Sequence, residues 1–292
     1  HVPLKNSPIP VFAQSASISG ILIRKLCLPG FAGDINGTST VGKTIAVQAS
    51  VSIYGNAEDP ATANGESCIQ GLNTTDNAFE HLAAHSNDGV LGIDETGRSS
   101  IKDMDSFLYG FGEGREKARM NKDSSMKDRV DRCSVTLLSG ERSIHDYAKR
   151  SNAGQRVRVL DISVPDEGAI RSEGEQTSED IAPKVKEACG RSYGTAAPKI
   201  IQWLIDNEND NPQFFADLKQ RFKDIHADLT VQEMTDQQRR GCQPFAVAIL
   251  ASEVACASGV FTESPEHYAS LIKEVRDHWL ENAEPLSNAK RS

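Results

Sequence analysis

The stretch NGTSTVGKTIAVQAS, residues 36–50, restricts the fold of this chain more than any other. It holds Gly37, Gly42, Lys43 and Thr44 at the G-x-x-x-x-G-K-[ST] spacing of a phosphate-binding loop. The segment GFAGDI just before it is weak in strand propensity, and we predict a strand there from its position. A helical pattern follows from Thr44 to Tyr54. Strand, glycine-rich turn and helix are the context that this motif requires.

The chemistry of such a loop predicts nucleotide binding. Its backbone N–H groups, with the helix N-terminus behind them, form a nest for anions. Lys43 would lie against the β- and γ-phosphates, and the Thr44 hydroxyl would hold Mg²⁺. The alternative is a glycine-rich turn without a ligand. The residues expected to bind the nucleotide here are Gly37, Thr38, Ser39, Thr40, Val41, Gly42, Lys43 and Thr44.

A second motif, GVLGIDE, reads as a buried strand that ends in two acids. Asp94 would orient Mg²⁺ at the end of that strand, and Glu95 would polarise the attacking water. A pair of solvated charges is the alternative reading. The second acid matters because ATP-hydrolysing motors generally carry it and small-molecule kinases need not.

Polar residues further along complete the expected site. Ser139 ends the apolar segment VTLLSG, where motors with an additional strand between the two motifs place a residue that contacts the γ-phosphate or the water. Arg150, Arg156 and Arg158 lie where an arginine could reach the γ-phosphate of a neighbouring subunit. The alternatives are that Ser139 is an ordinary turn residue and that Arg156 and Arg158 lie on an exposed strand face.

The order of elements predicts an α/β protein. Helical and strand patterns alternate through Val164, which indicates a parallel sheet flanked by helices with ligand chemistry at the strand C-termini. The polar segment PDEGAIRSEGEQTSED follows, and we expect it to be an exposed connection. Only helical patterns come after it. We therefore expect a P-loop ATPase core over residues 1–165 and a helical C-terminal lobe over 166–292.

Charge and composition narrow the functional classes. A net charge of −9 argues against a protein that coats nucleic acid through its overall field. Positive charge is nevertheless concentrated between Arg115 and Arg132, with seven Lys or Arg against four Asp or Glu. The six cysteines form no C-x-x-C pair, and no apolar run is long enough for a bilayer. We expect a cytoplasmic protein without membrane contact.

Other chemistries find little support. A guanine-reading N-K-x-D would need Asp at position 124, where Ser124 follows Asn121, Lys122 and Asp123. A small-molecule kinase would need a lid with paired arginines, which the sequence does not show. His145 is expected at the surface or against a helix, and Trp203 and Trp279 as packing anchors in helices.

Taken together, GTSTVGKTIAVQASVSIYGN, DGVLGIDETG, YGFGEGREKARM, VTLLSGERSI and GQRVRVLDI resemble the domain-of-unknown-function 927 family. Its members are helicases and inactivated derivatives of phages, plasmids and chromosomal islands. The resemblance begins partway into the family's domain, so the part normally upstream of Pro10 is expected to be missing.

The resemblance implies an AAA+ ATPase core related to hexameric replicative helicases. It matches Gly37, Lys43 and Thr44 to the first Walker motif, Asp94 and Glu95 to the second, Ser139 to the sensor, Arg158 to the arginine finger and Arg240 to a second sensor. It also places residues 110–132 where such helicases project a hairpin into their channel. There Arg115, Lys117, Arg119 and Lys122 could contact the phosphates of a threaded DNA strand, unless the segment is a solvated charged loop.

Two positions depart from the family pattern. Gly92 interrupts the second Walker strand, where a β-branched residue or Leu is usual. Pro244 precedes Phe245 where the family often shows an Arg, which leaves the coupling of ATP binding to lobe motion open.

The leading hypothesis is an ATP-hydrolysing, ring-forming DNA motor that serves replication of a mobile genetic element. ATP and Mg²⁺ would be its cofactors, single-stranded or forked DNA its substrate, and a hexamer of this chain its assembly. The alternative is an ATP-binding switch or scaffold that does not unwind DNA.

Overall fold

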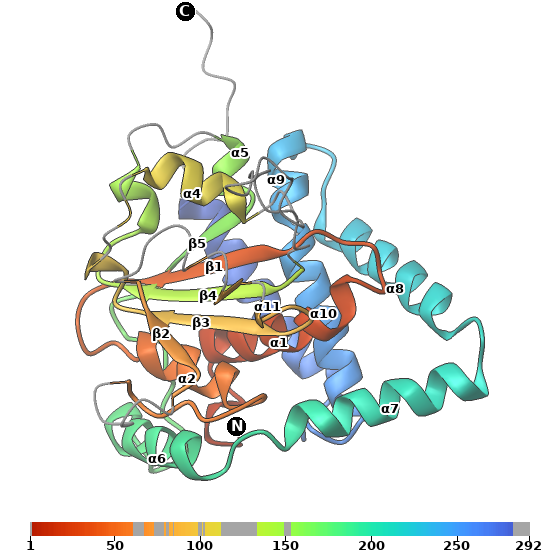
Figure 1. The fold of residues 1–292 in the computed structure, drawn as a ribbon, viewed down its shortest axis with the longest axis horizontal. Helices are drawn as coiled ribbons and strands as arrows, with labels where there is room; N and C mark the ends of the chain where they lie inside the picture. Colours follow the sequence, from red (N-terminus) through yellow and green to blue (C-terminus); the bar gives the residue numbers. More distant parts are fainter. Residues whose placement is uncertain are drawn as a thin grey trace, which may run out of the picture.

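The computed structural model describes residues 2–60, 67–72, 79, 82–83, 85–98, 101, 103–111, 133–148 and 153–282. Its centre is a parallel sheet of five strands in the order β2-β3-β4-β1-β5 (Figure 1). The strands are β1 (Phe31–Asn36), β2 (Ile69–Gly71), β3 (Val90–Asp94), β4 (Val135–Gly140) and β5 (Val159–Ser163). The α/β fold expected from the sequence is confirmed, and β4 lies between β1 and β3 as the motif order predicts.

Helix α1 (Pro8–Ile23) fills the space behind the sheet. It begins at Pro8, whose ring suits the first turn because no N–H is needed there. All of its residues except Ile21 are buried, since other elements cover it on every side. Its close approach to the sheet depends on Gly20, where a Cβ would lie 2.3 Å from the Gly89 carbonyl oxygen.

Helix α2 (Lys43–Val51) packs on the same face and explains the departure at Gly92. A Cβ on Gly92 would lie 2.4 Å from Val51 Cγ2 and 3.2 Å from Val47 Cγ1. The glycine therefore lets α2 approach β3 more closely than a branched residue would allow.

The opposite face of the sheet carries a second, smaller core. Ala32, Leu138 and Val159 face it from three strands. Helix α4 (Met104–Gly110) covers this face, and Phe79, Phe107 and Phe111 meet there with rings edge to face. Short elements nearby are the 3₁₀ helices Thr96–Arg98 and Ile144–Tyr147 and helix α5 (Ala153–Arg156), while a further 3₁₀ turn spans Val2–Leu4.

The C-terminal part is helical, as expected. Its helices are α6 (Ser178–Arg191), α7 (Ala196–Asp210), α8 (Phe214–Leu229), α9 (Asp236–Gly241), α10 (Gln243–Ala257) and α11 (Pro265–Asn282). Figure 1 shows α7 and α8 at the periphery, while α10 and α11 lie beside α1. Phe12 of α1 packs against Phe245 of α10, so one hydrophobic core joins the sheet to these helices. The division into 1–165 and 166–292 stays a prediction.

The segment after β5 corrects one expectation. Residues 165–177, which we call the strap, contain Ala169 and Ile170, both buried. The Ala169 N–H donates to the Val41 carbonyl over 2.7 Å. The strap is held against residues 37–42, which we call the phosphate loop. The reason is that β5 lies directly beside β1, so the chain leaves the sheet next to this loop.

His145 is buried, so of the two positions expected for it the one at the surface is wrong. Its Nε2 lies 2.9 Å from the Val159 carbonyl oxygen. Trp279 is a buried packing anchor, as expected, against Phe245 and the backbone of Gly241. In the part of the chain that the structure describes, no helix is long and apolar enough to cross a bilayer.

Candidate functional site

The loop between β1 and α2 is the base of the candidate site. Asn36 ends the strand and Lys43 begins the helix, so Gly37 to Gly42 form the turn between them. Gly42 has φ +87°, a left-handed conformation that glycine adopts without strain. Space at Gly42 is also limited, because a Cβ there would lie 3.2 Å from Ile170 of the strap. The motif spacing therefore corresponds to a tight turn with a helix N-terminus behind it.

Lys43 points back across this turn. Its Nζ donates to the Gly37 carbonyl over 2.8 Å and to the Thr38 carbonyl. Burial lowers the pKa of the Lys43 ammonium, while the nearby Glu141 and Asp94 carboxylates raise it. Lys43 therefore places a partly desolvated cation beside the loop. An anion bound there would be attracted more strongly than by a fully solvated lysine.

Asp94 is the point at which three motifs meet. Its Oδ1 accepts from the Thr44 hydroxyl over 3.2 Å and from the Ser139 hydroxyl over 2.5 Å. The Glu95 N–H also donates to it, over 3.0 Å. The ends of β1, β3 and β4 lie side by side, so residues far apart in sequence share one carboxylate. This convergence joins the phosphate loop, the acid pair and the expected sensor.

Glu95 follows Asp94 in a left-handed conformation, with φ +58°. Such a φ is rare for a residue with a long side chain and costs on the order of 1 kcal/mol. The turn takes the backbone out of the strand, and the Glu95 residue is exposed at the cavity. Strain at this position has to be held by the residues on either side.

A cavity of about 1640 Å³ opens over these groups. Its lining includes residues that the sequence did not identify, from the end of β4, the strap and α6: Arg142, Asp166, Glu167, Gly168, Ile170, Ser178, Glu179, Ala182, Pro183 and Lys186. The expected parallel sheet was the available signal, because a segment that leaves the C-terminal end of any of its strands emerges on the same side as the loop.

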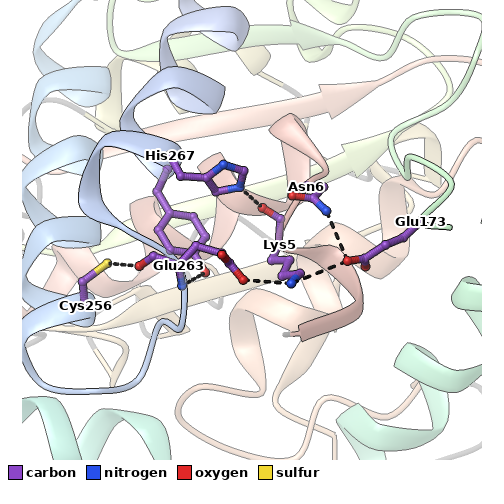
Figure 2. Close-up of polar contacts among 7 residues, drawn as sticks. Lys5, Asn6, Glu173, Cys256, Glu263 and His267 are labelled. Carbon is purple, nitrogen blue, oxygen red and sulfur yellow. Dashed lines mark hydrogen bonds and ion pairs between the residues drawn. The ribbon is translucent and has the colours of Figure 1, made fainter.

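The strap is fastened at its far end to Lys5 and Asn6, and Lys5 in turn contacts the segment around the start of α11. Figure 2 shows Lys5 between Glu263 and Glu173, at 2.8 Å and 3.6 Å, and Asn6 donating to Glu173 over 3.2 Å. His267 Nε2 lies 3.0 Å from the Lys5 carbonyl oxygen. The hydrogen bond and charge of Glu263 raise the Lys5 pKa. These contacts connect the phosphate loop, through the strap, with the turn before α11.

The expected arginines lie elsewhere. Arg158 and Arg240 line a second cavity, of about 260 Å³, together with Phe31 at the opposite end of β1. Arg156 precedes β5, at the same end of the strands as Arg158. The structure therefore does not bring Arg240 to the phosphate loop of the same chain, because α9 packs near α5. Arg150 and the candidate DNA contacts Arg115, Lys117, Arg119 and Lys122 lie outside the described residues.

The donor set fits Mg²⁺ that arrives with a nucleotide. Among the described residues, no three His, Cys, Asp or Glu side chains could hold a metal ion by themselves. Thr44 and Asp94 supply one hydroxyl and one carboxylate, and Mg²⁺ typically combines such a small protein contribution with phosphate oxygens. The Lys43 ammonium and the partly positive N–H groups of the loop are complementary in charge to the negative phosphates.

Comparisons with known proteins agree with this architecture. A solved structure described as "SCCmec type IV Cch - active helicase" superposes with a TM-score of 0.68 at 21% sequence identity, which shows a shared fold. The match covers 96% of this chain and 47% of that one, so this chain spans about half of that protein's length. A search of curated proteins gave no match. Residues 3–131 match the family model described as "Domain of unknown function (DUF927)", which confirms the family resemblance expected from the sequence over that range.

Proposed function

We propose that this chain binds ATP with Mg²⁺ and hydrolyses it, as a helicase-like motor on DNA. The observation that carries the proposal is the convergence of the Thr44 and Ser139 hydroxyls on Asp94, within one cavity that also contains Lys43 and Glu95. A phosphate-binding turn alone would support binding. The second acid and the strand placed between the two motifs support hydrolysis.

Each residue has a role that follows from its position. Lys43 and the loop N–H groups bind the phosphates, and Thr44 and Asp94 hold the metal ion. Glu95 accepts a proton from the attacking water, and Ser139 orients that water or the γ-phosphate by a hydrogen bond. Bound Mg²⁺-ATP supplies the phosphoryl group and the positive charge that neutralises it.

The arginines support a site shared between subunits. Arg158 and Arg240 lie at the N-terminal ends of the strands, and the phosphate loop lies at the C-terminal ends. Neither arginine is therefore placed to contact the loop of its own chain. In a ring, that edge of one subunit can face the cavity of the next, where an arginine would stabilise the transition-state charge. We propose a homo-oligomeric ring, a hexamer by family resemblance, with Arg158 as the finger and Arg240 beside it.

DNA as the substrate rests on the family resemblance and on the structural neighbour, which is described as an active helicase. The proposed setting is replication of a mobile genetic element in the cytoplasm, with single-stranded or forked DNA threaded through the ring. Arg115, Lys117, Arg119 and Lys122 are the proposed DNA contacts.

The test is the rate of ATP hydrolysis with and without single-stranded DNA, measured together with the mass in solution in the presence of ATP. We expect DNA-stimulated turnover by an oligomer, and loss of turnover in Lys43→Ala with the fold retained by circular dichroism. Turnover that survives in Lys43→Ala would contradict the proposed site. A monomer indifferent to DNA would support the switch or scaffold instead.

A further inference from the structure

The junction between the acid pair and the sensor strand is unusually close. Gly140 ends β4 directly after Ser139, and a Cβ built on it would lie 2.0 Å from Thr96 Oγ1 and 3.4 Å from Thr96 Cβ. Its φ is outside the left-handed region, so the glycine is required for space and not for backbone conformation. Thr96 therefore rests directly on the Gly140 backbone.

Gly140 also contacts the phosphate loop. Its carbonyl accepts from the Gly37 N–H over 3.3 Å, and the next residue, Glu141, accepts from the Ser39 hydroxyl over 2.5 Å. The same short segment thus touches the phosphate loop on one side and the turn after Glu95 on the other. A displacement at Gly140 would change the distance between the phosphates and Glu95.

Thr96 is fully buried, yet its hydroxyl has no hydrogen-bond partner in the described structure. A buried hydroxyl without a partner destabilises a fold, so this side chain is not retained there for a hydrogen bond within it. Its volume fills the space above Gly140. The strained turn at Glu95 is consequently held on both sides, by Asp94 Oδ1 before it and by the Thr96 side chain after it.

We propose that Thr96, seated on Gly140, is a positioning residue that fixes Glu95 relative to the phosphate loop. The inference rests on the proposed hydrolysis, because Glu95 acts only in that reaction. It assigns to Thr96 a steric role, in which shape matters and the hydroxyl does not. A misplacement of about 1 Å in a catalytic group can reduce a rate about 100-fold.

The experiment compares kcat and Mg²⁺-ATP affinity, the latter measured with a fluorescent nucleotide, across substitutions in the full chain. Gly140→Ala should lower kcat by roughly 10- to 100-fold and leave nucleotide affinity nearly unchanged, because the new Cβ displaces Thr96 and with it Glu95. The double variant Gly140→Ala/Thr96→Ala should recover most of kcat, since the contacts that remain, 3.3 Å from the Arg142 carbonyl oxygen and 3.4 Å from the Cβ of residue 96, require only a small shift. Thr96→Val should retain kcat because it keeps the volume.

A matched control separates positioning from damage to the fold. Gly20→Ala introduces a comparable clash, 2.3 Å from the Gly89 carbonyl oxygen, at the other end of β3 from the cavity. We expect it to lower the free energy of unfolding while kcat per folded molecule is kept. A fall in kcat as large as that of Gly140→Ala would show that any packing defect suffices, and would overturn the inference.

The remaining outcomes are equally decisive. Suppose that the wild-type chain hydrolyses ATP. An unchanged kcat in Gly140→Ala would then overturn the positioning role, and so would a double variant whose kcat does not recover. Neither result would contradict hydrolysis itself. A loss of kcat in Thr96→Val would show that the hydroxyl itself acts, which also overturns the positioning role. No turnover by the wild-type chain, with nucleotide still bound, would instead overturn the proposed hydrolysis, and the positioning role with it.

Discussion

Ser139 donates a 2.5 Å hydrogen bond to the Asp94 carboxylate across 45 positions of sequence. The contact exists because β4 lies between β1 and β3, so Ser139, the last residue but one of β4, reaches the acid that ends β3. Thr44 reaches the same oxygen from the phosphate loop. One carboxylate thereby links nucleotide binding to the strand that would sense the γ-phosphate.

The first prediction concerns Ser139. Replacement by Ala removes the hydroxyl from a position next to the reacting groups, and loss of one such donor typically costs about 100- to 1000-fold in kcat. Nucleotide affinity should change little, because Lys43 and the loop stay in place. Single-turnover hydrolysis alongside nucleotide titration checks this, and an unaltered kcat in Ser139→Ala would remove the sensor role.

The second prediction concerns the arginines at the opposite sheet edge. If Arg158 acts on the site of a neighbour, Arg158→Ala and Lys43→Ala should each be inactive alone. Mixed rings then contain some interfaces with an intact loop facing an intact arginine, so part of the turnover should return. Titration of one variant into the other tests this. The absence of any recovery, with mixed oligomers shown by mass, would argue against a shared site.

The third prediction concerns the contact of the strap with the phosphate loop. Ile170 is buried against Gly42, and Ile170→Ala should lower the free energy of unfolding by about 2–5 kcal/mol. The loop would lose its outer support, so nucleotide affinity should fall as well. Chemical denaturation and nucleotide titration measure the two effects. Ile225 of α8 is also buried in the same core, so Ile225→Ala serves as the control that should lower stability alone.

The fourth prediction concerns pH. Asp34 is fully buried in β1, and desolvation raises its pKa from 3.8 to about 8, although the Ile144 N–H donates to it over 2.7 Å. Between these values the native state keeps a proton that the unfolded chain has lost. Stability therefore falls as pH rises through this window, by at most about 1.4 kcal/mol per pH unit from this group.

Asp34→Asn keeps an acceptor for the Ile144 N–H and removes the titration. Urea unfolding of both proteins at pH 6.5 and 7.5 should show the wild type losing stability relative to the variant. This interval avoids most of the titration of His145, whose pKa is lowered by burial and which acts in the opposite direction at lower pH. Equal pH dependence of the two proteins would contradict a proton on Asp34.

The sequence predicts the local parts of this fold well. The phosphate loop, the acid pair and the end of β4 are each encoded by a few adjacent residues whose pattern requires a strand, a turn or a helix start. Strand β2 was not predicted, because three residues, Ile69 to Gly71, are too few to show a period. Helix α9 is likewise short, although Thr235 and Gln238 form a capping box.

Features that depend on distant neighbours were harder to predict. The strap is polar in composition, and its burial at Ala169 and Ile170 follows only from the position of β5 beside β1. Arg240 resembles a second sensor by sequence, and its place across the sheet from the loop follows from the packing of α9. Gly92 is unusual as a strand residue, and the close packing of α2 on β3, which the sequence does not show, explains it.

Hydrolysis at this site is tested by the ATP turnover of the wild-type chain and of Glu95→Gln at saturating Mg²⁺-ATP, with bound nucleotide measured in the same samples. The amide keeps the size of the side chain but cannot accept the proton of the attacking water. We predict equal nucleotide binding and a loss of turnover of roughly 100-fold or more. Equal turnover in the two proteins would contradict hydrolysis at this site.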